Sequence, residues 1–167
     1  MLIIIVGGSC VGKSSLERIL VDELDFSPLN ILTTRSRRED DPSWVTCDID
    51  DEYPYHVDKY HKITGVNGHH YLIELPHDDD NYVTSVIDVV EAFRINNIYK
   101  STICLLDRCD GEVWTCINNR DISIDEKVKR YNQFINIRNR YYKDPRIVFK
   151  DRLGCIEYIK KKKKKIR

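Results

Sequence analysis

The stretch IIIVGGSCVGKSSLE, residues 3–17, runs from an apolar segment straight into Gly12, Lys13 and Ser14. The segment Leu2–Val6 is short, mostly β-branched and followed by glycine, which predicts a buried strand. From Lys13 to Leu24 apolar residues recur at helical spacing, which predicts a helix with one apolar face. The stretch therefore predicts a strand, a glycine-rich turn and a helix in direct succession.

The turn matches the pattern G-x-x-x-x-G-K-[ST] through Gly7, Gly12, Lys13 and Ser14. Glycines let the backbone wrap around phosphates, the lysine reaches the β- and γ-phosphates, and the Ser14 hydroxyl can ligate Mg²⁺. A plain glycine turn is the alternative. The pattern predicts a nucleoside triphosphate, such as ATP, and Mg²⁺ as ligands, but it does not define a reaction. The predicted contacts are Gly7, Gly8, Ser9, Cys10, Val11, Gly12, Lys13, Ser14 and Ser15.

Length and composition predict one soluble globular domain over residues 1–167, with 41% hydrophobic and 32% charged residues. The apolar run at the start is too short to span a membrane and lacks the flanks of a signal peptide. The six cysteines form no C-x-x-C pair, which favours reduced thiols. We therefore expect a cytoplasmic protein without membrane partners; composition does not define its oligomeric state.

The charge is unevenly distributed along the chain. Residues 121–167 carry a net charge of +10, and the rest carries −10. A basic tail over 160–167 includes six consecutive lysines. We expect a frayed, solvated helix end, and a nucleic-acid contact remains the alternative.

Strand and helix patterns alternate beyond residue 84. The expected elements are a helix capped at Thr84, a strand ending at Asp107, a turn and strand over 109–117, a helix opened by the capping box Ser123-x-x-Glu126, a strand at 146–149 and a helix over 153–165. Together with a short apolar run at 29–32, this order predicts an α/β fold with a mostly parallel central sheet.

Residues 34–82 are irregular and polar, and such a long segment is usually functional. Thr34, Arg35 and Arg38 follow the apolar run at 29–32, where two arginines could converge on one phosphate. A solvated basic turn paired with the acidic residues 39–41 is the alternative. The histidines and aspartates between 56 and 80 lack metal-ligand spacing, which favours a polar acceptor-binding segment over a metal cluster.

Four motifs occur in an order that resembles the guanylate kinase family of P-loop nucleoside monophosphate kinases. They are GGSCVGKS at 7–14, TTRSRR at 33–38, YVT at 82–84 and LLD at 105–107. RDISIDEKVKR at 120–130 is similar to the lid segment of that family, and RIVFKDRLGCIEYIK at 146–160 is similar to its closing strand and helix.

The resemblance implies a three-layer P-loop NTPase fold with an acceptor-binding insertion at 34–82 and a short lid-like segment at 118–130. It implies ATP- and Mg²⁺-dependent phosphoryl transfer to (d)GMP or another (d)NMP, the nucleoside monophosphate partner. The implied roles are acceptor phosphate binding by Thr34, Arg35, Arg38 and Tyr82, base recognition by Glu74 and Thr84, Mg²⁺ binding by Ser14 and Asp107, and charge neutralisation by Lys13, Arg120 and Arg130.

The chain departs from the family pattern at several positions. Val83 and Cys10 stand where glycine is usual, the tyrosine-bearing segment after the arginines is unrecognisable, and only twelve residues separate Asp107 from Arg120. Two alternatives therefore stay open. One is a P-loop kinase acting on another nucleotide or on a modified base in DNA, and the other is a guanylate-kinase-like binding module without activity.

Overall fold

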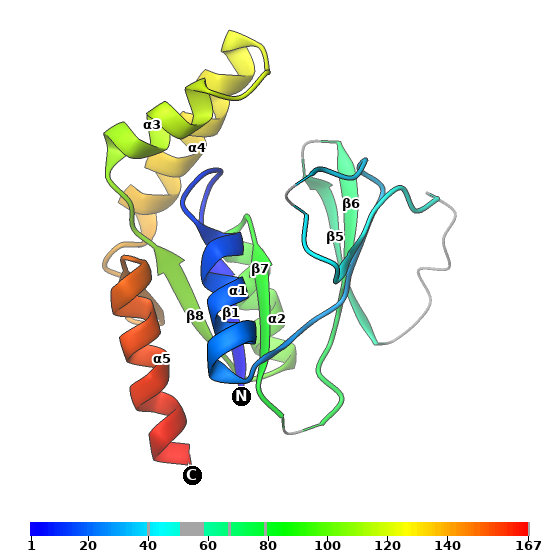
Figure 1. The fold of residues 1–167 in the computed structure, drawn as a ribbon, viewed down its shortest axis with the longest axis vertical. Helices are drawn as coiled ribbons and strands as arrows, with labels where there is room; N and C mark the ends of the chain where they lie inside the picture. Colours follow the sequence, from blue (N-terminus) through cyan, green and yellow to red (C-terminus); the bar gives the residue numbers. More distant parts are fainter. Residues whose placement is uncertain (40, 51–58, 67, 79, 167) are drawn as a thin grey trace.

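The computed structural model describes residues 1–39, 41–50, 59–66, 68–78 and 80–166, and its core is a parallel sheet (Figure 1). Five strands lie in the order β2-β7-β1-β8-β9, and every neighbouring pair is parallel. Their bounds are β1 Leu2–Val6, β2 Ser27–Pro28, β7 Tyr82–Val86, β8 Ser101–Leu106 and β9 Ile147–Lys150. The expected α/β class with a parallel central sheet is confirmed.

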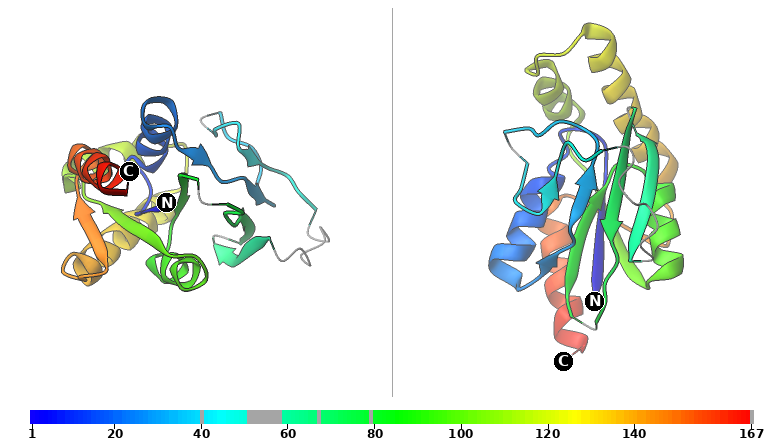
Figure 2. Two further views of the ribbon diagram at one scale, coloured as in Figure 1. Left: turned by 90° about the horizontal axis from the view of Figure 1, so that it is seen from below. Right: turned by 90° about the vertical axis from the view of Figure 1, so that its right-hand side faces the viewer.

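Helices cover both faces of this sheet, as the view along the strands shows (Figure 2). α1 (Lys13–Leu24) and α5 (Arg152–Ile166) lie on one face, and α2 (Val89–Ile98) lies on the other. β1 is buried along its whole length because its side chains alternate between the two apolar cores. The predicted strand and helix around the glycine-rich turn are confirmed.

A second sheet is built from the segment between β2 and β7. Its order is β4-β3-β6-β5, with β3 Ile31–Thr33, β4 Val45–Thr46, β5 Tyr60–Val66 and β6 His69–Glu74. The apolar run at 29–32 thus contributes a strand to this sheet and not to the central parallel sheet, which corrects the prediction from its pattern. β3 pairs antiparallel with β6 in the register Thr33↔Tyr71, which sets the direction of the residues that follow β3.

The segment 82–98 corrects the helix that we expected from Thr84. Tyr82–Val86 is strand β7, hydrogen-bonded to both β1 and β2, and α2 begins only at Val89. Asp88 is the N-cap, and its side chain accepts a hydrogen bond from the Val90 N–H (2.9 Å). Pairing with distant strands therefore overrides the local helical spacing.

The segment 110–118 corrects the expected turn and strand. It forms helix α3 (Asp110–Asn118), whose buried Val113 and Ile117 lie four residues apart on one face. α4 (Ile124–Tyr141) follows, and Ser123 caps it by accepting from the Glu126 N–H (3.2 Å), as the capping box predicts. The segment 118–130 thus comprises the last residue of α3, the connection 119–123 and the first two turns of α4.

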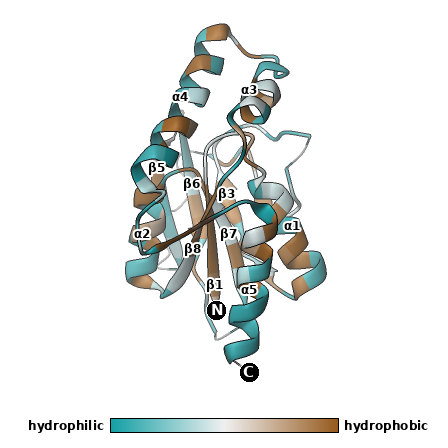
Figure 3. Ribbon diagram, turned by 90° about the vertical axis from the view of Figure 1, so that its left-hand side faces the viewer, coloured by the Kyte–Doolittle hydropathy of each residue, from teal (hydrophilic) through white to brown (hydrophobic). Residues whose placement is uncertain are grey.

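The basic tail is helical and not frayed, because α5 continues to Ile166. Lys162 Nζ donates to Thr102 Oγ1, and Lys163 Nζ donates to the Leu24 carbonyl oxygen. Hydrophobic residues line the inner strands and the inward helix faces, whereas the end of α5 is hydrophilic (Figure 3).

Within the described ranges no helix has both the length and the apolarity to cross a membrane.

Candidate functional site

The glycine-rich loop joins β1 to α1 in a conformation that its glycines make accessible. Gly7 has φ 155° and Gly12 has φ 99°, and a Cβ on Gly7 would lie 2.6 Å from Val11 Cγ2. A Cβ on Gly8 would lie 3.0 Å from the Cβ of Phe134 on α4. The first glycine therefore permits the turn, and the second permits the close approach of α4.

The loop carries Lys13 and leads directly into the start of α1. Lys13 Nζ donates to the carbonyl oxygens of Gly7 and Gly8, both at 2.8 Å, and so folds back over the loop. α1 starts without a side-chain cap or an acidic residue in its first turn. Its first N–H groups and positive end are therefore suited to an anion. Burial lowers the pKa of Lys13 to about 8.

A cavity of about 380 Å³ lies between this loop, α1, the second sheet, the connection from β7 into α2, and the end of α3. One end is basic and polar and includes the loop residues with Arg38, Arg108 and Arg120. The other end combines apolar walls with carboxylates. Its lining includes Ile31, Val45, Ile63, Ile73, Val86, Glu17, Asp88 and Glu91.

Among the predicted contacts, Ser9, Cys10, Gly12, Lys13, Ser14, Ser15, Arg35, Arg38 and Arg120 line this cavity.

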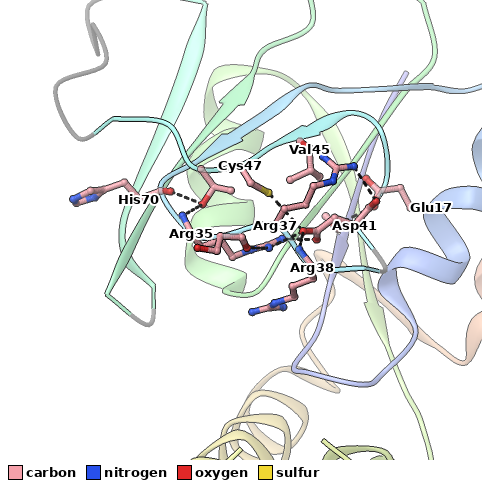
Figure 4. A network of polar contacts seen from close by, with 11 residues as sticks. Glu17, Arg35, Arg37, Arg38, Asp41, Val45, Cys47 and His70 are labelled. Carbon is pink, nitrogen blue, oxygen red and sulfur yellow. Dashed lines mark hydrogen bonds and ion pairs between the residues drawn. The ribbon is translucent and has the colours of Figure 1, made fainter. Parts of the chain in front are cut away.

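The two arginines after β3 reach the cavity in different states (Figure 4). Arg35 forms a buried two-pronged pair with Asp41, with Nη2–Oδ1 at 2.5 Å and Nη1–Oδ2 at 2.7 Å. The pairing raises the pKa of Arg35 and holds the pKa of Asp41 near 2. Arg38 extends away from this pair, and its guanidinium has no hydrogen bond or ion pair in the part of the chain that the structure describes. Of the two, Arg38 is therefore the one available to a phosphate.

Tyr71 is a cavity residue that sequence reasoning did not single out. It lies on β6 opposite Thr33 and lines the cavity together with Arg35 and Arg38. The signal that could have found it is the alternating HHYLIE segment, once paired with the strand that precedes the arginines. Tyr71 stands where a phenol could share a bound phosphate with Arg38.

Tyr82, Thr84 and Glu74 do not line the cavity. Tyr82 begins β7 beside Leu2, at the sheet edge opposite the loop, and its hydroxyl donates to Asp78 Oδ1 (2.9 Å). Thr84 is fully buried in the middle of the central sheet. Glu74 accepts from Asn30 Nδ2 (2.6 Å) at the end of β6.

Thr34 is also engaged elsewhere, since its N–H and its hydroxyl oxygen both bond to the His70 backbone. Three of the predicted loop contacts are buried within the loop and do not line the cavity, namely Gly7, Gly8 and Val11. Of the residues expected to hold the acceptor, Arg35 and Arg38 line the cavity, and Tyr71 lines it beside them.

The expected magnesium ligands separate in the structure. Ser14 is exposed on the cavity wall, but Asp107 forms an ion pair with Arg138 (3.1 Å) and does not line the cavity. No cluster of three His, Cys, Asp or Glu side chains that could hold a metal ion occurs among the described residues. Mg²⁺ would therefore depend on nucleotide phosphates together with the Ser14 hydroxyl, a donor set that suits this ion.

The remaining predicted arginines border the basic end. Arg120 lines the cavity next to the Cys10 thiol, whereas Arg130 is bound to Glu126 (Nε–Oε1 2.8 Å) and acts on Arg38 only through its charge. Burial and a hydrogen bond with Cys116 raise the pKa of Cys10 to about 11. Cys10 is therefore a neutral thiol in the loop.

No family model matches the sequence, and no curated protein is significantly similar to it.

Proposed function

We propose that this protein is a nucleotide kinase of the guanylate kinase type, which transfers the γ-phosphoryl group of ATP to a nucleoside monophosphate. The observation that carries the proposal is a single cavity lined by two separate groups of residues whose chemistry suits phosphate. The loop around Lys13 supplies one, and Arg38 and Tyr71 of the second sheet supply the other.

In this mechanism the donor triphosphate lies on the loop, with Lys13 and the start of α1 against its β- and γ-phosphates. Mg²⁺, when bound with the nucleotide, neutralises part of the phosphate charge. Arg38 and Tyr71 hold the acceptor phosphate, whose oxygen attacks the γ-phosphorus in line while the β–γ bridging oxygen leaves with ADP. The attacking oxygen is already ionised, so no general base is required. Catalysis consists of positioning and charge neutralisation, to which Arg120 contributes.

The alternatives have less support. The basic tail is the end of α5, which lies at the opposite end of the strands from the loop (Figure 1). Two of its lysines, Lys162 and Lys163, form hydrogen bonds within the protein. This position does not favour a nucleic-acid acceptor at the cavity. An inactive binding module would not need Lys13 and the glycines that shape the loop.

The test is ADP release from ATP–Mg²⁺ with each of the common NMPs and dNMPs as acceptor. We expect release to depend on the acceptor and to fall about 100-fold or more in Lys13→Ala, because a cation facing the transferring group is lost. Lys100→Ala, which changes an exposed lysine before β8, is the matched control and should keep full activity. Equal activity in Lys13→Ala and the wild type would reject the proposal.

A further inference from the structure

The acidic end of the cavity contains a carboxyl group that the proposed phosphate chemistry does not use. Glu17 lies on α1 four residues after Lys13, so both side chains emerge from the same helix face. It is 2% exposed and lines the cavity. Carboxylates are seldom buried without full pairing, so this side chain requires an explanation.

The hydrogen bonding of Glu17 is incomplete. Ser85 Oγ donates to Oε2 at 3.3 Å, a long bond. Trp44 is near enough to favour the charged form of the carboxyl group, yet Glu17 Oε1 and Trp44 Nε1 both lack a hydrogen bond of normal geometry within the described residues. Of the buried polar atoms without a partner there, Glu17 Oε1 is the one that belongs to a cavity-lining residue.

The surroundings of Glu17 indicate what the cavity would hold at this end. The other carboxylates at this end are already engaged, because Glu91 binds His61 (3.0 Å) and Arg94, and Asp88 caps α2. Apolar side chains of the second sheet form the opposite wall, and they would suit a flat ring. A ligand with its phosphate at Arg38 would extend its nucleoside toward this end.

We propose that Glu17 determines acceptor specificity, with Oε1 accepting a hydrogen bond from an N–H of the base or an O–H of the sugar. The inference rests on the proposed function and defines its acceptor as a nucleotide that presents such a donor. A site with a buried acceptor discriminates strongly against an analogue that lacks the donor, since the carboxylate is then left unpaired.

The test measures binding, so that it does not depend on phosphoryl transfer. Dissociation constants of GMP, AMP, CMP, UMP and their 2′-deoxy forms are determined by calorimetry, separately from that of ATP–Mg²⁺. The variants are Glu17→Met, which keeps length but removes the acceptor, Glu17→Gln, which keeps a neutral acceptor, and Glu23→Gln, an exposed control on the same helix.

For the monophosphate that binds tightest, we expect Glu17→Met to weaken binding about 10- to 100-fold and Glu17→Gln to weaken it less. ATP–Mg²⁺ binding should change less than twofold in both variants, which a merely structural role would not predict. IMP in place of GMP, or deoxyribose in place of ribose, should weaken binding to the wild type but not to Glu17→Met. The analogue that behaves in this way identifies base or sugar as the donor.

An unchanged monophosphate panel in Glu17→Met, or an equal loss of ATP and monophosphate binding, would overturn the inference while leaving the kinase proposal intact. Monophosphate binding without acceptor-dependent ADP release would reject the kinase proposal and leave the role of Glu17 standing. Absence of any monophosphate binding to the wild type would overturn both.

Discussion

Replacing Glu17 by glutamine should change how the stability of the protein depends on pH. Burial raises the pKa of the Glu17 carboxyl group from its ordinary value of 4.5 to about 7, although Ser85, Trp44 and Lys13 all favour the charged form. The folded protein therefore holds this proton more tightly than the unfolded chain between these two pH values. Because the unfolded chain releases the proton first, the free energy of unfolding falls as the pH rises from 4.5 through 7.

The size of the effect on the free energy of unfolding follows from the difference between the two pKa values of Glu17. Each pH unit between the two pKa values corresponds to about 1.4 kcal/mol, so ionisation of Glu17 costs the folded state about 3 kcal/mol above pH 7. Glutamine does not titrate. The free energy of unfolding of the wild type minus that of Glu17→Gln should therefore decrease by about 3 kcal/mol between pH 4.5 and pH 8.

Urea unfolding at several pH values across this range measures the difference directly, and the subtraction cancels the titration of groups that do not interact with Glu17. Glu23→Gln should follow the wild type at every pH, since Glu23 is exposed. A difference that stays constant within about 0.5 kcal/mol across the range would refute the reasoning, because it would mean that Glu17 titrates alike in both states.

Three other substitutions or modifications test the remaining parts of the site. Tyr71→Phe should raise the KM for the acceptor roughly fivefold without changing the KM for ATP, because one hydrogen bond to the acceptor phosphate is lost. Equal changes in the two KM values would contradict this role, and Tyr158→Phe on α5 is the control. Asp41→Ala should lower the free energy of unfolding by about 3 kcal/mol in urea unfolding, because it leaves the buried Arg35 without its partner, whereas the exposed Asp22→Ala should have little effect. Alkylation of Cys10 by iodoacetamide should be slow at pH 7, because its pKa lies near 11, and complete modification should abolish ATP binding; full binding by the modified protein would show that the loop tolerates the added group.

The parts of the fold that the sequence predicted are those fixed by local patterns. The apolar run of β1, the glycine-rich turn and the start of α1 follow one another within 24 residues, and the capping box at Ser123 is a local signal as well. The strand at Tyr82–Val86 was missed because its conformation depends on pairing with β1, some eighty residues away. α3 was missed because Asp110 and Gly111 suggested a turn, while the spacing of Val113 and Ile117 fits the helix.

The candidate site divides in the same way. The loop half was predicted because a single segment contains it. The acceptor half depends on how β3 pairs with β6, and this register brings Tyr71, rather than Tyr82, to the arginines. The distribution of charge in the sequence also left open whether the Arg35 and Arg38 side chains are paired. In the structure the Arg35 side chain forms an ion pair with Asp41, whereas the Arg38 side chain does not.

The central claim is that one cavity binds both a phosphoryl donor and a monophosphate acceptor. Its most direct test follows the label from γ-³²P-ATP, with Mg²⁺ and the acceptor that binds tightest, and separates the products by chromatography. The account predicts that the label moves into the nucleoside diphosphate, and that Lys13→Ala transfers about 100-fold less or lower still. Label found only in inorganic phosphate, or left in ATP when both nucleotides are bound, would contradict it.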